Sequence, residues 1–245
     1  MQDTEYIYGI RAVLEALRAG KGLERIYMQH GLKGTLFREL EHEARTHKLK
    51  IQYVPKERLN RFPTENHQGV VAAVAPIRYE DYQALIDRVT ESKKDAVFLL
   101  LDGVSDVRNL GAIIRTAACT GVDALILPAS GSAPVNADTV KTSAGAVFHL
   151  PIARVPHLKD AVYYLQALGI PLWAASEKAE HSVYDANFTS GFALIMGSEG
   201  KGVSPALLKL TDGQLRLPMR GDIASLNVSV ACGVILYEMV RQRGY

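Results

Sequence analysis

The chain has 245 residues, of which 48% are hydrophobic and 22% charged, and its formal net charge is +2. This length allows one large domain or two smaller ones, and the hydrophobic share is sufficient for a buried core. The longest apolar runs, such as Val97–Leu101, are far too short to cross a bilayer. Met1–Gly9 lacks the basic start and apolar run of a secretory signal peptide. We therefore expect a cytoplasmic protein that does not enter a membrane.

Cysteine and histidine usage argues against redox and metal chemistry. Cys119 and Cys232 lie among small apolar residues, so we expect both to be reduced, buried thiols rather than nucleophiles. The seven histidines show no spacing typical of a metal site, and we expect no metal ligands. Residues 1–70 hold twelve Lys/Arg against nine Asp/Glu. This mild basic bias fits an RNA-binding module and an ordinary solvated surface equally well.

The first segment reads as a small α/β unit. Hydrophobic spacing and Gly20 predict a helix over 9–19, and a charged amphipathic helix follows over 36–47. Short strands are expected over 25–28, 51–54 and 69–75. We assign residues 1–76 to this unit. Residues 77–95 carry charged residues around one helix, and we expect them to form a linker.

The remainder, residues 96–245, alternates short apolar strands with helices. Several strands are continuous apolar runs, which is typical of a parallel sheet buried on both faces. Ligand chemistry is then expected at the carboxyl ends of the strands. The expected strands are 97–101, 124–127, 148–152, 172–175, 192–196 and 215–218, and the expected helices are 109–120, 136–144, 158–168, 205–210 and 226–243.

Three loops that follow strands in this domain have unusual composition. The first runs over 102–111 into a helix that contains Arg115, the second is Gly197–Gly202, and the third runs over 219–229. None of them has the spacing of a Walker A loop or a dinucleotide-binding fingerprint. Three glycines within Gly197–Gly202 nevertheless indicate a close backbone approach or a positive φ.

Together the loops resemble the three motifs of the SpoU family of RNA 2′-O-ribose methyltransferases, which belongs to the knotted SPOUT class. The matching residues are Asn109–Gly111 with Arg115, then Gly197–Gly200, then Leu217–Met219 with Ser225–Asn227. The resemblance covers the chain from about residue 97 to its end. One departure is Val107, where the family often has proline, and this puts in doubt the entry of the first loop rather than any polar residue.

The resemblance implies a fold and an activity. The fold is a C-terminal parallel-sheet SPOUT domain with a C-terminal trefoil knot, plus a small N-terminal α/β RNA-binding domain similar to a small ribosomal protein. Tyr8–Ile10 and His67–Gly69 look like the substrate-binding domain of the ribosomal-RNA branch. The implied activity is transfer of a methyl group from S-adenosylmethionine to the ribose of a guanosine in large-subunit (23S) ribosomal RNA.

Two alternatives stay open at this point. A transfer-RNA 2′-O-methyltransferase would use the same chemistry, although such family members generally lack a separate N-terminal domain. A non-catalytic RNA-binding protein of the same fold would have lost motif residues. Arg115, Glu199 and Asn227 are all present, which argues against that second alternative.

The resemblance also assigns roles to residues of the motifs. The implied catalytic set is Asn109, Arg115, Glu199, Ser225 and Asn227. A guanidinium is effectively never deprotonated, so Arg115 suits a clamp on phosphate and developing oxyanion better than a base. Ordinary alternatives are a surface arginine, a helix-capping Asn109 and a solvated Glu199. Of Ser225 and Asn227, one must cap the last helix and the other is free to face substrate.

Donor binding and self-association complete the expectations. By resemblance, Gly197, Leu217 and Leu226 hold S-adenosylmethionine largely through backbone groups. The apolar residues of the last helix spread over more than the stripe that packing on one sheet requires, which predicts a homodimer. Met239 is expected on the outward face. These apolar residues are Val228, Ala231, Val234, Ile235, Leu236, Met239 and Val240.

Overall fold

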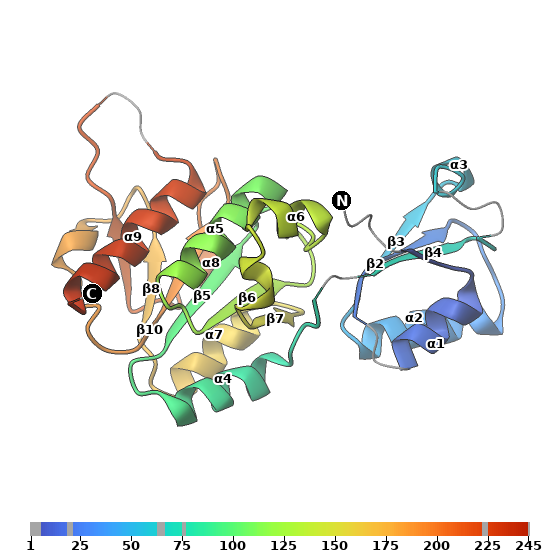
Figure 1. Cartoon of the computed structure of the whole chain (residues 1–245), viewed down its shortest axis with the longest axis horizontal. Coiled ribbons are helices and arrows are strands. Elements are labelled where there is room, and N and C mark those ends of the chain that lie inside the picture. The colour runs from blue at the N-terminus through green and yellow to red at the C-terminus, as the bar shows by residue number, and fades with distance from the viewer. Residues whose placement is uncertain (1–5, 19–21, 63–66, 75–76, 222–224, 245) are drawn as a thin grey trace. The chain divides into compact units, whose positions relative to one another are not determined.

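The computed structural model describes residues 6–18, 22–62, 67–74, 77–221 and 225–244. Two compact units make up the chain: Met1–Arg78 with Val135–Ala137, and Tyr79–Pro134 with Asp138–Tyr245 (Figure 1). Each unit is considered by itself. Among the described residues, no helix is both long and apolar enough to cross a membrane.

The first unit is a four-stranded sheet with strand order β1-β4-β2-β3. β4 runs antiparallel to β1 and β2, and β3 runs parallel to β2. Helices α1 and α2 cover one face, on which Ile26 and Met28 are buried (Figure 1). The bounds are β1 Tyr6–Tyr8, α1 Ile10–Arg18, β2 Leu23–Gln29, α2 Thr35–Thr46, β3 Ile51–Val54, α3 Lys56–Leu59 and β4 Val70–Val74.

The expected helices and strands of this unit are confirmed to within two residues at each end. Strand β1 and helix α3 were not predicted, and both are short. Three residues, Tyr6–Tyr8, are too few to display an alternating pattern. The α/β class is confirmed for this unit.

The second unit contains a seven-stranded sheet with strand order β7-β6-β5-β10-β8-β11-β9, and every neighbouring pair is parallel. The expected parallel-sheet core is therefore confirmed. The strands are β5 Val97–Asp102, β6 Ala124–Pro128, β7 Ile152–Val155, β8 Leu172–Ala175, β9 His181–Ser182, β10 Phe192–Gly197 and β11 Gly213–Arg216.

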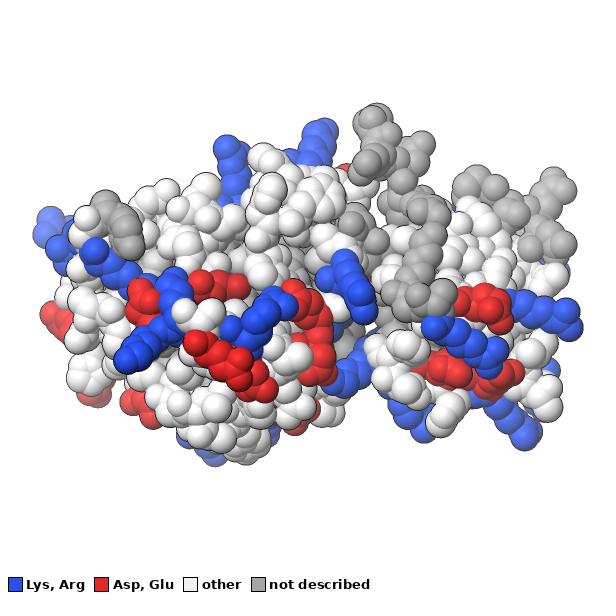
Figure 2. Space-filling model, turned by 60° about the horizontal axis from the view of Figure 1, so that its bottom comes forward, with Lys and Arg blue, Asp and Glu red and all other residues white. Residues whose placement is uncertain are grey.

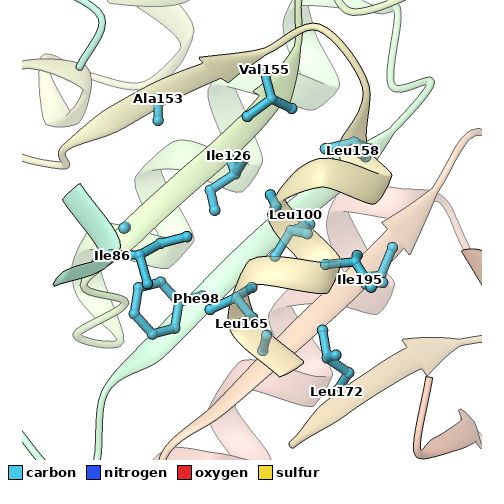
Figure 3. Packing of buried hydrophobic residues seen from close by; sticks show 14 of the residues in the cluster. Ile86, Phe98, Leu100, Ile126, Ala153, Val155, Leu158, Leu165, Leu172 and Ile195 are labelled. Atoms are coloured by element: carbon cyan, nitrogen blue, oxygen red, sulfur yellow. The ribbon is translucent and has the colours of Figure 1, made fainter. Parts of the chain in front are cut away.

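Helices cover both faces of this sheet, with α4 and α7 on one side and α5, α6 and α9 on the other (Figure 1). Beneath α4 and α7, apolar side chains of five strands form one cluster, in which Phe98 and Leu100 are fully buried (Figure 3). The bounds are α4 Tyr82–Ser92, α5 Val107–Cys119, α6 Ala137–Thr142, η1 Ala146–Phe148, α7 Leu158–Ala167, η2 Val183–Asp185, α8 Pro205–Leu208 and α9 Val228–Gln242.

Two expectations about this unit differ from the structure. The expected linker contains α4, whose Leu85, Ile86 and Val89 are buried in the core cluster, so this segment packs as part of the second unit. The prediction of a strand over 148–152 is wrong. Phe148 ends a 3-10 turn with 54% of its surface exposed, and β7 starts only after Pro151. A proline has no N–H to donate to a ladder, which explains this later start.

Burial also corrects the expectations for a cysteine and a methionine. Cys119 is exposed at the end of α5, whereas Cys232 is buried and desolvation raises the pKa of its thiol to about 12. Met239 is 1% exposed, so it does not face outward. It belongs to an inner stripe of α9 (Cys232, Ile235, Leu236 and Met239) that packs inside the unit. An outer stripe carries Val230 and Tyr237, which are 51% and 56% exposed.

Candidate active site

A cavity of about 530 Å³ lies where β8, β10 and β11 end, beside the first turn of α9. The carboxyl ends of parallel strands are where ligand sites of such sheets are expected. All three residues expected to bind the methyl donor, Gly197, Leu217 and Leu226, line this cavity. Its other apolar lining includes Met196, Val203, Leu208, Leu215, Val228, Ala231 and Ile235, and its polar lining includes Ser176, Glu177, Lys178, Ser198, Glu199 and Lys201.

The wall formed by the loop after β10 depends on a glycine. A Cβ added to Gly197 would lie 1.9 Å from the carbonyl carbon of Gly202 and 2.1 Å from the nitrogen of Val203. The backbones of Ser198 and Gly202 exchange two hydrogen bonds of 3.2 and 2.9 Å, which close the loop against its own strand. Any side chain at position 197 would therefore force this loop away from β10, which confirms the close backbone approach expected from the glycine content.

Asp102 fixes the far end of the same loop, and sequence reasoning did not select it. This residue ends β5, and its carboxylate accepts a hydrogen bond of 2.7 Å from the backbone N–H of Ser204. The bond ties the loop of the second motif to the strand that precedes the first. An acidic residue at the end of a continuous apolar strand was the available signal.

Asn227 joins residues of all three motif loops. Its Nδ2 donates to Oδ1 of Asn109 over 3.0 Å and also hydrogen-bonds to Oε1 of Glu199. Its Oδ1 accepts from the N–H of Ser229 at 2.9 Å and so caps α9. One side chain therefore begins the last helix and holds together three loops that are remote in sequence.

This network decides between several of the alternatives for individual residues. Asn109 does not cap its helix, because the side chain of Asp106 accepts from the Asn109 N–H at 2.8 Å and caps α5. Asn227 is the cap of α9, which leaves Ser225 exposed and lining the cavity. Glu199 is exposed but hydrogen-bonded to Asn227.

Arg115 is not brought to this network. Its side chain is exposed, does not line the cavity, and makes no hydrogen bond or ion pair with any residue that the structure describes. It lies six residues after Asn109 on α5, which places it ~9 Å further along the axis and ~120° around the helix. Within one chain, the expected clamp points away from Asn109.

The loop after β8 is a part of the site that no motif indicated. Ser176, Glu177 and Lys178 line the cavity, and the Ser176 hydroxyl accepts from the N–H of Lys178 at 3.3 Å. Lys178 and Lys201 supply the cationic groups of the described lining, and Glu177 and Glu199 supply its carboxylates. The cavity is thus apolar in its body and close to charge-balanced at its polar edge.

Comparison with known proteins shows which family the chain belongs to. The model of the SpoU rRNA Methylase family matches residues 96–237. The chain belongs to the SpoU family. A second model, for the substrate-binding domain of RNA 2′-O ribose methyltransferases, matches residues 6–80. The resemblance inferred from the motifs is confirmed, and this SpoU protein is an RNA methyltransferase.

Relatives along the whole chain agree with this assignment. A protein of Staphylococcus aureus (strain MSSA476) named for the TrmH family of tRNA/rRNA methyltransferases is 36% identical, over 99% of this chain and 98% of its own length. The SpoU methyltransferase AviRb from Streptomyces viridochromogenes, in complex with the cofactor AdoMet, is 31% identical with a TM-score of 0.61, and the match covers 97% of this SpoU chain and 90% of AviRb.

A tRNA-modifying member of the family matches less of the chain. The TrmH/SpoU tRNA modifying enzyme of A. aeolicus is 28% identical with a TM-score of 0.56. The match covers 84% of that enzyme but 65% of this chain. The second unit of this SpoU protein is therefore sufficient to account for such a match.

Proposed function

We propose that this SpoU-family RNA methyltransferase transfers a methyl group from S-adenosylmethionine to the ribose 2′-hydroxyl of a guanosine in large-subunit ribosomal RNA. The observation that carries this proposal is the Asn227 network. It links Asn109 and Glu199 at the edge of the cavity lined by the expected donor-binding residues. The substrate-binding family model over residues 6–80 supports the ribose 2′-oxygen as the acceptor.

The cavity fits the methyl donor. Its volume of about 530 Å³ lies within the range of small-molecule sites, ~300–1,000 Å³. The apolar body suits the adenine ring, and the backbone groups of the tightly folded loop after Gly197 suit its ring nitrogens. When bound, S-adenosylmethionine supplies an electrophilic methyl group on a sulfonium. AviRb, which is 31% identical, was crystallised with this cofactor.

The residues of the chain then have to position the acceptor and neutralise developing charge. Holding the ribose oxygen in line with the methyl group removes much of the entropic part of the barrier. Asn227 keeps the loops of Asn109 and Glu199 at fixed positions for this purpose. Arg115 clamps an RNA phosphate, because its guanidinium remains charged, and the hydroxyl proton passes to a phosphate oxygen or to water.

A homodimer accounts for the orientation of Arg115. Its side chain points away from Asn109 in its own chain, and α5 packs beside α9, whose outer stripe exposes Val230 and Tyr237. A second copy seated on that stripe buries these side chains and brings α5 of one copy toward the cavity of the other. The exposed outer stripe supports this arrangement. Met239, which was expected on the outward face, is buried and does not support it.

Ribosomal RNA is favoured over transfer RNA by the first unit. The substrate-binding model covers it, whereas the tRNA-modifying relative matches 65% of the chain. A transfer-RNA substrate remains the alternative, since the S. aureus relative is named for both substrates. The trefoil knot and the cytoplasmic location stay predictions.

The decisive experiment is methyl transfer by the purified protein. Radiolabelled S-adenosylmethionine is supplied with total ribosomal RNA or total transfer RNA, and the RNA is digested to nucleosides for mass spectrometry. We expect 2′-O-methylguanosine from 23S RNA. Label on a base, or in transfer RNA alone, would overturn the corresponding part of the proposal.

A further inference from the structure

The four-stranded sheet of the first unit has a second face that α1 and α2 do not cover. Side chains alternate along each strand, so Tyr27 lies on the opposite face from Ile26 and Met28. Strand register brings Tyr8 and Tyr27 onto one row across β1, β4 and β2, with Val71 between them. The row of Tyr6, Ala73 and Arg25 lies beside it.

Aromatic side chains dominate this face, which the short helix α3 covers in part and which is here called the aromatic face. Tyr6, Tyr8, Tyr27 and Phe62 are each partly exposed and pack against a small buried cluster of Val54, Val71 and Leu59, the last of which belongs to α3. Phe62 contacts the rings of Tyr6 and Tyr27 at centroid distances of 4.9 and 5.2 Å. The hydroxyls of Tyr8 and Tyr27 make no hydrogen bond to any residue that the structure describes, which leaves their polar ends available to a ligand.

Positive charge borders the same face. Arg25 lies on it and is partly exposed. Described residues 55–62, which include α3, add exposed Lys56, Arg58 and Arg61 against one carboxylate, Glu57. A hollow beside α3 is lined by Arg58, Arg61 and Phe62 together with Pro55 and Glu57. Aromatic surface and cations therefore lie side by side.

The helix-covered side of the unit is different. There Arg18 pairs with Glu15, Glu39 and Glu43, and acidic side chains lie between basic ones (Figure 2). Its exposed tyrosine, Tyr53, donates a hydrogen bond of 2.6 Å to Glu41, which raises the pKa of that phenol to about 12. Arg18 and Tyr53 on this side are therefore paired with carboxylates, whereas the described residues give no such partner to the side chains of Arg58 and Arg61.

We propose that the aromatic face of the four-stranded sheet binds unpaired nucleotides of the substrate RNA, with bases stacked on Tyr8 and Tyr27 and phosphates held by Arg25, Arg58 and Arg61. Aromatic side chains on a sheet stack bases of single-stranded RNA, and cations at the border follow the backbone. Double-stranded RNA offers no exposed base faces, so this surface selects a loop or bulge. The proposal rests on the proposed function.

Binding of labelled RNA to the full-length protein tests the stacking role. The probe is a fluorescein-labelled oligoadenylate of about twelve nucleotides, a length that covers one site of this kind. We expect Tyr8→Leu or Tyr27→Leu to raise the Kd for this probe by about fivefold or more, because a stacked base is lost. Tyr27→Phe keeps the ring and should bind within about twofold. Tyr53→Leu, on the helix-covered side, is the matched control and should leave the Kd unchanged.

Salt dependence tests the cations separately. Arg58→Gln with Arg61→Gln should make the plot of log Kd against log salt shallower, because fewer phosphates are neutralised. Tyr27→Leu should weaken binding with the slope retained. Arg38→Gln, on α2, is the control for charge loss. Thermal unfolding of each variant identifies any that lose the fold. If Tyr27→Leu loses the fold, Tyr8→Leu and Arg58→Gln keep the test decisive.

The outcomes separate this proposal from the proposed function. Undiminished oligoadenylate binding by both tyrosine variants would overturn the stacking surface while leaving methyl transfer intact. Equal loss of binding to a paired RNA duplex of the same length would also overturn it, because stacking requires unpaired bases. A protein that binds the oligonucleotide through these tyrosines but methylates no RNA would instead refute the proposed function alone.

Discussion

The two sheets of this protein are covered differently, and the difference separates two kinds of binding. The seven-stranded sheet has helices on both faces, so its two faces are covered, and the cavity lies at the carboxyl ends of its strands. The four-stranded sheet has its two long helices on one face, which leaves tyrosines and arginines on the other. A small donor suits the first arrangement, and an extended polymer suits the second.

Arg115→Ala should have the largest effect. Loss of a cation that stabilises developing charge lowers turnover by about a hundredfold or more. Binding of S-adenosylmethionine, measured by calorimetry, should change by less than about threefold, because Arg115 does not line the cavity. Lys159→Ala on α7 is the control and should retain activity. A variant that no longer binds donor would place Arg115 in the cavity instead and break the division between the two functions.

The two stripes of α9 should respond differently to charge. Met239→Glu buries a carboxylate in the core and should lower the free energy of unfolding by about 3 kcal/mol or more. Tyr237→Glu, on the exposed outer stripe, should leave the monomer folded and prevent dimer formation, with a loss of turnover. Light scattering and thermal unfolding measure both. A monomeric wild type with full activity would contradict the proposed homodimer.

Gly197→Ala should act on the donor site alone. The added Cβ would overlap the backbone of Gly202 and Val203, so the loop must shift, and the Kd for S-adenosylmethionine should rise about tenfold or more. Gly221→Ala is the control, because a Cβ there meets nothing within 4 Å. Affinity for oligoadenylate should be unchanged in both variants. Parallel loss of RNA affinity would show that the two sheets do not act separately.

The smallest effect expected is on acid stability. Hydrogen bonds from Arg241 first, and then from Gln242, lower the pKa of Glu238 from its usual 4.5 to about 2. A carboxyl group with a depressed folded pKa stabilises the protein fully above the unfolded value and loses this contribution as pH falls from about 4.5 to 2. Glu238→Gln should therefore flatten the stability profile in this window, as measured by denaturant unfolding. Exposed Glu91→Gln should leave the profile unchanged.

Hydrophobic patterns in the sequence predicted the buried strands of the second unit. Val97–Leu101 and Phe192–Met196 are continuous apolar runs of the length typical of buried strands, and both strands are confirmed. Residues 148–152 are also mostly apolar, but they do not form a strand. A 3-10 turn that follows Gly145 (φ +82°) ends at Phe148, and Pro151, which has no backbone N–H, precedes the start of β7. Burial of Met239 rather than Tyr237 depends on how α9 rotates against the sheet, which composition does not specify.

In the candidate active site, too, the sequence predicted the residues that belong to motifs but not those brought there by the arrangement of the strands. Gly197, Leu217 and Leu226 were predicted through motifs and share one cavity. Ser176–Lys178 belong to no motif, so their presence follows only from the order of β8 beside β10 and β11. Arg115 lies on the exposed side of α5, and the motif that contains it does not specify how the side chain is oriented relative to Asn109.

The double role of Asn227 makes the start of α9 a reporter of the site. Its carbonyl oxygen accepts the Ser229 N–H while its amide nitrogen contacts Asn109 and Glu199, so one rotamer satisfies both sets of bonds. The amide proton of Ser229 can exchange with solvent only when that rotamer is lost and the three loops separate. Its hydrogen-exchange rate therefore measures how often the empty site comes apart, and donor binding should slow it in proportion to occupancy.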